Sequence, residues 1–221
     1  MTFQTSALPR YSFYEELANS ITHGIGILLS IAGLGVLTAF ASVFGSVWHI
    51  VSCSIYGGTM ILLFTTSTLY HSIPLQKAKA VFRTLDHSSI FLLIAGTYTP
   101  VTLVCLRGPW GWSLFGTIWG LAIAGIVLEI FLPKNLRFII VSLYVAMGWT
   151  VIVAVGPMLS MVAPGGLWLL LIGGLCYTLG IPFYLWKSMP FNHAIWHLFV
   201  LAGAIFQFFS ILLYVVPVLT N

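Results

Sequence analysis

The stretch that decides the fold runs from Leu17 to Gln76 and reads LANSITHGIGILLSIAGLGVLTAFASVFGSVWHIVSCSIYGGTMILLFTTSTLYHSIPLQ. Over these 60 residues it contains no Asp, Glu, Lys or Arg. A helix needs roughly 20 apolar residues to cross a bilayer, so the stretch is long enough for two crossings with a turn near Phe44–Trp48. The sequence therefore predicts an integral membrane protein that begins with a helical hairpin.

The rest of the chain repeats this pattern in shorter runs. Of the 221 residues, 60% are hydrophobic and 5% are charged, whereas a soluble domain carries about 25% charged residues. We therefore predict an all-α fold, a single membrane domain over residues 1–221, with a short interfacial helix at about 12–19 before the first span. The seven transmembrane helices are expected at 22–44, 49–71, 87–106, 111–132, 138–156, 166–186 and 193–216.

The basic residues orient these spans. One side of the membrane receives Arg10, Lys77, Lys79, Arg83, Lys134, Arg137 and Lys187, and the other receives only Arg107. The positive-inside rule then places the N-terminus in the cytoplasm and the C-terminus outside. We expect a multi-pass protein of the cell membrane that contacts membrane lipids and no nucleic acid, with tryptophans near the span ends: Trp48, Trp110, Trp112, Trp149, Trp168 and Trp186.

Three histidines fall at one predicted depth. His193 and His197 are four residues apart at the start of the last span, so both share a helix face, and His71 ends the second span on the same side. Three imidazoles with one open position are typical of a catalytic zinc, although this ligand set does not exclude iron. The alternative for the His193–His197 pair is two histidines that face lipid headgroups.

Two further polar residues belong to the same side. Ser67 lies one turn from His71 on the same face and is placed to hydrogen-bond a ligand or a bound water. Asp86 is either a carboxylate that ligates the metal or deprotonates its water, or a helix-terminal carboxylate that pairs with Arg83. His87 points about 100° away from Asp86, so we leave it out of the site.

The first span adds Glu16, Asn19 and His23, which are spaced along one helical face. Metal-bound imidazoles generally need a partner on the second ring nitrogen, and these three residues are candidates for that role. The alternative is a polar cap on the first helix. His49 is isolated on the other side of the membrane, and Cys53, Cys105 and Cys176 form no metal-binding spacing.

The ordered set of motifs resembles the haemolysin III family, the bacterial branch of the progestin and adipoQ receptor group. The motifs are Glu16-x2-Asn19-x3-His23, Ser67-x3-His71, Asp86, Gly96-Thr97-Tyr98-Thr99-Pro100 and His193-x3-His197. This resemblance implies seven helices and a zinc ion near the cytoplasmic face. It implies that His71, His193 and His197 bind zinc, that Asp86 contacts it through water, and that Ser67 is a neighbouring polar residue.

Three functions are compatible with such a site. The first is a metal-dependent hydrolase of membrane lipids, since relatives are associated with ceramide-like amide hydrolysis and with membrane-lipid or membrane-energy homeostasis. The second is a receptor-like sensor in which zinc is structural. The third is a pore-forming or haemolytic protein, although few charged residues are available to line a path for water.

Overall fold

The structure, a computed structural model, describes residues 11–133 and 136–216. Within these ranges all regular elements are helical, and seven helical segments are long and apolar enough to cross a membrane. The predicted all-α, seven-span fold is therefore confirmed. The elements are α1 (Phe13–Phe44), α2 (Val47–Ser72), α3 (Gln76–Pro100), the π-helical turn η1 (Val101–Cys105), α4 (Pro109–Phe131), α5 (Arg137–Trp149), the 3₁₀ turn η3 (Thr150–Ala154), α6 (Val155–Met161), α7 (Pro164–Leu185), α8 (Asn192–Ser210) and the π-helical turn η4 (Ile211–Val215).

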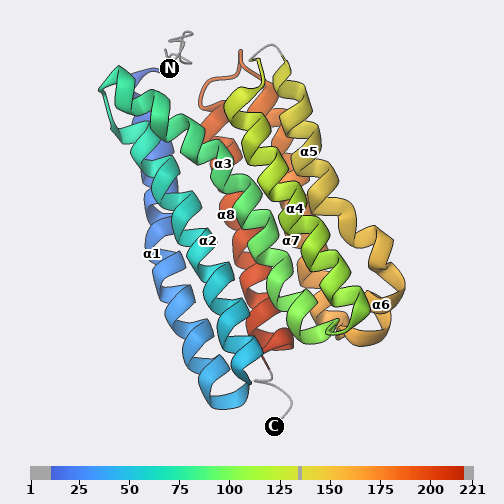
Figure 1. The fold of residues 1–221 in the computed structure, drawn as a ribbon. Helices are drawn as coiled ribbons and strands as arrows, with labels where there is room; N and C mark the ends of the chain where they lie inside the picture. The colour runs from blue at the N-terminus through green and yellow to red at the C-terminus, as the bar shows by residue number, and fades with distance from the viewer. Residues whose placement is uncertain (1–10, 134–135, 217–221) are drawn as a thin grey trace.

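The helices form an up-and-down bundle (Figure 1). Sequence neighbours pack side by side, and α8 packs against both α7 and α1, so the last helix closes the bundle onto the first. The α1–α2 hairpin turns at Gly45–Ser46, within the predicted turn. As expected for seven spans, α1 begins and α8 ends at opposite ends of the bundle (Figure 1).

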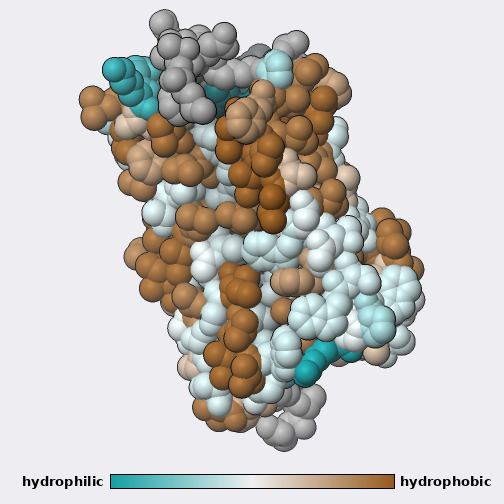
Figure 2. All heavy atoms as spheres, in the orientation of Figure 1, coloured by the Kyte–Doolittle hydropathy of each residue, from teal (hydrophilic) through white to brown (hydrophobic). Residues whose placement is uncertain are grey.

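The spans differ in how much of their surface lies inside the protein. In the most apolar window of each span, 67% of residues are buried for Gln76–Cys105 but only 17% for Arg137–Met161. The α3 helix is therefore central, whereas the α5–α6 span is peripheral. Figure 2 shows that the most hydrophilic side chains on the visible face lie toward the two ends, with apolar and weakly polar side chains between them. This pattern fits a bundle surrounded by lipid.

The predicted separate helix at about 12–19 is wrong, because these residues form the first turns of α1. A capping box begins the helix: the Glu15 amide donates to Ser12 Oγ (3.3 Å) and the Ser12 amide donates to Glu15 Oε2 (2.8 Å). Residues 13–23 contain neither Gly nor Pro, so nothing interrupts the helix before the membrane span.

Two other predicted boundaries change for local reasons. The third span begins at Gln76 instead of 87, because the basic segment after Pro74 is itself helical. The fifth span continues to Met161 past Gly156-Pro157, because the 3₁₀ turn η3 restarts the helix at Val155. Pro157 is then in the first turn of α6, where a backbone N–H has no intrahelical partner in any case.

Small residues bring the site-bearing helices close together. A Cβ atom on Gly26 of α1 would lie 2.4 Å from the Phe64 ring of α2, and one on Gly180 of α7 would lie 2.6 Å from the Trp196 ring of α8. Gly24 and Gly35, by contrast, face open space. The glycines of α1 therefore serve close packing only on the face that also carries Asn19 and His23.

The sidedness of the protein stays a prediction, since the helices alone do not show which end faces the cytoplasm. Arg10 and Lys134, which contribute to the basic side, lie outside the described residues. Arg107 stacks over the Trp48 ring at 4.3 Å, at the end of the bundle where α1 turns into α2.

Candidate metal centre

Two helix ends bring His71, His193 and His197 together. His71 is in the last turn of α2, and the other two lie on the first turns of α8. One ring nitrogen from each lies within 4.8 Å of the other two, and all three side chains are buried, with 1–5% of their surface exposed. The i, i+4 spacing places His193 and His197 on one face, as predicted from the sequence, and the α1–α2–α8 packing brings His71 to them.

The partners of His71 leave one of its nitrogens free. Its Nδ1 donates to Glu16 Oε2 at 2.6 Å and lies 3.3 Å from Asn19 Nδ2. Its Nε2 is buried without a hydrogen-bond partner among the described residues. A carboxylate on Nδ1 fixes the tautomer that carries the lone pair on Nε2, which is the arrangement that metal-bound histidines generally have.

A backbone carbonyl group holds His197 in the same way. Its Nδ1 donates to the Asn19 carbonyl oxygen at 3.2 Å and lies 3.2 Å from Thr22 Oγ1. Both ring nitrogens of His193 are buried without a partner among the described residues. A buried imidazole that lacks hydrogen bonds is costly, so the unpaired nitrogens mark the three rings as a candidate ligand site.

The residues predicted to support the ligands lie around them. Glu16 bridges His71 and Lys79, whose Nζ lies 2.7 Å from Glu16 Oε1. The ring of His23 stacks on His197 at 3.5 Å between centroids, and both its nitrogens lack partners among the described residues. Glu16 and Asn19 thus contact the predicted ligand histidines directly, while His23 contacts one of them through its ring face.

Tyr11 covers the histidines just before α1 begins. Its ring stacks on His193 at 5.3 Å and lies 5.8 Å from the ring of His71. Burial raises the pKa of Tyr11 above its usual value, so the phenol stays neutral beside the imidazoles. The sequence interpretation did not single out Tyr11, because a lone tyrosine before a span is a common interfacial residue.

Ser67 and Asp86 lie next to the histidine group. Ser67 is fully buried, and its hydroxyl has no hydrogen-bond partner of good geometry within the described chain. Asp86 is 6% exposed and lies outside the group of mutually close ligand atoms. Its expected alternative partner, Arg83, forms no ion pair with it in the described ranges. Asp86 thus lines the same cavity as His193 and His197, with the Ser67 hydroxyl as its neighbour and no ion pair among the described residues.

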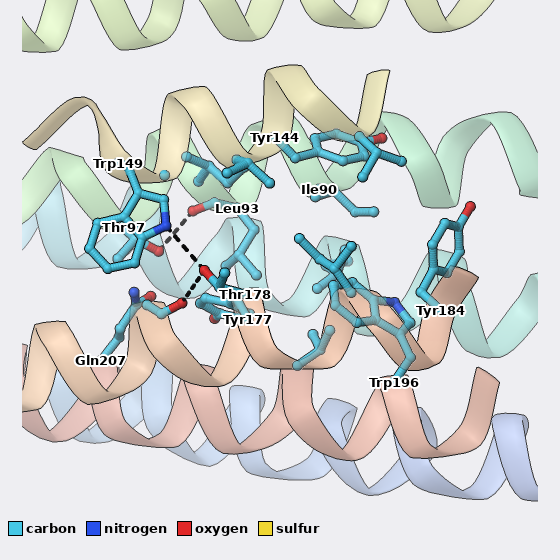
Figure 3. Close-up of a pocket in the computed structure, with 18 of the residues that line it drawn as sticks. Ile90, Leu93, Thr97, Tyr144, Trp149, Tyr177, Thr178, Tyr184, Trp196 and Gln207 are labelled. Carbon is cyan, nitrogen blue, oxygen red and sulfur yellow. Dashed lines mark hydrogen bonds between the residues drawn. The ribbon is translucent and has the colours of Figure 1, made fainter. Parts of the chain in front are cut away.

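A cavity of about 670 Å³ extends from the histidines into the bundle. Figure 3 shows its wall, with Ile90, Leu93 and Thr97 from α3, Tyr144 and Trp149 from α5, Tyr177, Thr178 and Tyr184 from α7, and Trp196 and Gln207 from α8. His193, His197 and Asp86 line the same cavity. Its volume falls within the range of small-molecule sites.

Trp149 corrects one expectation about the tryptophans. It lies in the middle of the Arg137–Met161 span, lines the cavity, and its Nε1 donates to Thr178 Oγ1 at 3.1 Å (Figure 3). Only the tertiary structure shows this position, because the sequence pattern placed a span end near residue 156. Trp149 is therefore part of the cavity wall and not of an interfacial belt.

Comparison with known proteins identifies the family. Residues 11–208 match the family described as Haemolysin-III related. The chain belongs to the haemolysin III family. It is 51% identical over 205 residues to the Hemolysin-3 of Bacillus cereus, covering 92% of this chain and 93% of that protein. It is 49% identical over 210 residues to the Hemolysin-3 homolog of Bacillus subtilis (strain 168), covering 94% and 98%.

A more distant similarity extends to animals. The Monocyte to macrophage differentiation factor of Homo sapiens is 30% identical over 221 residues, covering 96% of this chain and 90% of that protein. The resemblance to the haemolysin III family drawn from the spaced motifs is therefore confirmed, and the chain is a multi-pass cell-membrane protein. The metal and the roles of the individual residues stay predictions.

This haemolysin III protein has a second polar cluster that the sequence interpretation missed. Glu129 Oε1 lies 2.7 Å from Arg137 Nη2 and 3.0 Å from His87 Nδ1, and the Tyr144 hydroxyl donates to the His87 carbonyl at 2.8 Å. These side chains come from α3, α4 and α5. A sequence signal existed, since Glu129 and Arg137 flank the loop on the basic side and so lie at the depth of His87.

Proposed function

We propose that this protein is a zinc-dependent hydrolase of membrane lipids that acts in membrane-lipid homeostasis. The observation that carries the proposal is the junction of the histidine cluster with the cavity. Ring nitrogens that have no partner among the described residues lie at one end of a space that is lined mainly by apolar side chains and is the size of a ligand site. A substrate with a hydrocarbon chain fits such a space, and a polar bond at its head would lie beside the histidines.

The donor set supports zinc as the metal. Three neutral imidazoles suit zinc, and catalytic zinc sites keep one position for water or substrate. When bound, zinc lowers the pKa of water towards about 7 and polarises a carbonyl oxygen. Glu16 would hold His71 in the tautomer that presents Nε2, and the Asn19 carbonyl oxygen would do the same for His197.

Asp86 and Ser67 supply the remaining chemistry. Asp86 is a buried carboxylate with no ion-pair partner in the described part of the chain, and it lines the cavity. A carboxylate oxygen in this place is suited to accept the proton of the attacking water and to return it to the leaving group. The buried hydroxyl of Ser67 is suited to orient that water or the Asp86 carboxylate.

The decisive experiment measures lipid turnover. Purified protein would be incubated with ceramides and with phospholipids, with and without a chelator, and the products identified by mass spectrometry. We expect fatty acid release that the chelator abolishes and added zinc restores. Bound zinc without turnover would instead favour a receptor-like sensor. Leakage of liposomes without lipid breakdown would favour the activity that the name Hemolysin-3 of the Bacillus cereus relative suggests.

Asp86→Asn tests the role of the carboxylate. The amide keeps the size of the side chain and one oxygen but cannot accept the proton, so we expect zinc to be retained and turnover to fall by about 10²–10⁴-fold. Loss of zinc in this variant would make Asp86 a direct ligand. Unchanged turnover with unchanged zinc would reduce it to a structural residue. Elemental analysis and product assay on one preparation separate the three outcomes.

A further inference from the structure

Three basic side chains lie along the cavity at the histidine end. Arg83 of α3, Arg137 of α5 and Lys187, which follows α7, all line the same cavity as His193 and Asp86. The two arginines are partly buried and Lys187 is exposed. Lys77 is also exposed and comes from the same side of the membrane, but it does not line this cavity. The placement of the three cations is therefore more specific than a general basic surface.

The carboxylates of the protein neutralise these cations only in part. Glu129 lines the same cavity and pairs with Arg137, and Asp86 lines it without an ion pair among the described residues. All four Asp and Glu residues of the chain are described, and Glu16 pairs with His71 and Lys79 while Glu129 pairs with Arg137 and His87. Glu15 instead accepts hydrogen bonds from the backbone amides of Ser12 and Phe191. Among the described residues, neither Arg83 nor Lys187 forms an ion pair with any of them.

The three cations also share one electrostatic field. Partial burial, and then the positive charges of Arg137 and Arg83, lower the pKa of Lys187 below its usual value. Lys187 Nζ donates to the Tyr184 carbonyl at 2.5 Å and lies 4.2 Å from the Tyr184 ring. Three cations against the two carboxylates of Asp86 and Glu129 leave a net positive charge along this cavity, which favours an anionic ligand.

We infer that Arg83, Arg137 and Lys187 bind the phosphate headgroup of an amphiphile whose hydrocarbon chain lies in the cavity. Guanidinium groups match phosphate oxygens with paired hydrogen bonds. A phosphate monoester carries about 1.5–2 negative charges. This charge matches the two cations without an ion pair among the described residues, Arg83 and Lys187, better than the single charge of a carboxylate headgroup would. The inference rests on the proposed function in one respect: it names the class of lipid that the hydrolytic site would receive.

Binding of oleoyl lysophosphatidate tests the inference directly. Its affinity for the purified protein in uncharged detergent would be compared with that of monooleoylglycerol, which has the same chain without phosphate, and with that of inorganic phosphate. We expect the phosphate lipid to bind the most tightly of the three. Arg83→Gln should weaken lysophosphatidate binding by about tenfold, because it removes a charged hydrogen-bond donor, and should leave monooleoylglycerol binding unchanged.

The control variants distinguish charges that line the cavity from charges on the surrounding surface. Lys77→Gln removes one positive charge at the same end outside the cavity and should change neither affinity. Lys187→Gln, at an exposed position, should weaken lysophosphatidate binding by about threefold and provides a second variant if Arg83→Gln is unstable. Equal losses in Lys77→Gln and Lys187→Gln, or equal affinity of the native protein for the two lipids, would overturn the inference. Inorganic phosphate that binds as tightly as the phosphate lipid would overturn the role of the hydrocarbon chain.

The test is independent of catalysis because it measures binding. Product analysis on the same samples shows which proposal fails. Phosphate preference without products would support phosphate binding by the three basic residues and contradict the hydrolase activity. Products from uncharged lipid without phosphate preference would support the hydrolase activity and contradict phosphate binding by the basic residues.

Discussion

Two polar clusters lie at the same end of this bundle, and they differ in how their hydrogen bonds are satisfied. In the His87–Glu129–Arg137 cluster, one carboxylate oxygen contacts both a histidine and an arginine. In the His71–His193–His197 cluster, three ring nitrogens, Nε2 of His71 and both nitrogens of His193, have no partner among the described residues. Both clusters are buried in a bundle that lipid surrounds.

The difference marks the histidine cluster, and not the Glu129 cluster, as the candidate metal site. Polar groups buried in a membrane protein need partners, and the Glu129 cluster supplies its own. The histidine cluster has partners only on one side: Glu16 and the Asn19 backbone hold two rings, and the inward nitrogens are left over. A set of lone pairs that converge without a donor is what a metal ion would complete.

His193→Ala should have the largest effect on the metal content. A three-histidine site with one ligand removed holds zinc poorly, so we expect the metal content to fall from about one ion per chain to near zero. Elemental analysis of the purified protein measures this loss. His49→Ala, at the opposite end of the bundle and paired with Ser46, is the matched control and should keep the metal. Stoichiometric zinc in His193→Ala would remove this residue from the site.

Glu16→Gln should have an intermediate effect. The variant keeps the shape of the side chain but loses the charge that holds His71 and pairs with Lys79. Loss of such a partner typically lowers metal affinity by about 10–100-fold, which a competition titration with a chelator of known affinity would measure. Glu15→Gln is the neighbouring control, since Glu15 contacts Ser12 and Phe191. Equal affinities in the two variants would contradict the role of Glu16.

Glu129→Ala should leave zinc untouched and lower the stability of the protein. It removes the partner of His87 and of Arg137, whose side chains are 10% and 27% exposed. We expect a loss of roughly 2–3 kcal/mol in the free energy of unfolding, toward the lower end for a broken buried pair because Arg137 keeps some access to water. Thermal unfolding in detergent measures the loss. A fall in metal content would show that the two clusters form one site.

Much of the fold could be predicted because hydrophobic length is a local property. The turn at Gly45–Ser46 and the start of α4 at Pro109 follow from the charge-free runs and from their breakers. The start of α1 at Phe13 did not, because the Ser12–Glu15 cap joins two segments that composition alone separates. The continuation past Gly156-Pro157 was missed because a proline in the first turn of a helix does not end it.

The candidate site was predictable in its residues and not in its connections. The HxxxH spacing and the shared depth of His71, Glu16 and Asn19 follow from helical periodicity and span order. The contacts of Tyr11 with His193, and of Glu129 with Arg137 and His87, join segments that no spacing rule relates. The cavity wall formed by Trp149 and Thr178 likewise depends on how α5 and α7 pack.

The sequence by itself therefore determined the class of the protein, the number of its spans and the histidines that share a depth. A bilayer imposes one length and one polarity on every crossing segment, and both can be counted along the chain. The tertiary structure decided which polar groups satisfy one another and which are left unpaired beside the cavity. That outcome depends on the rotation and distance of helices far apart in the chain, as where α8 packs against α1 and brings His197 to Asn19.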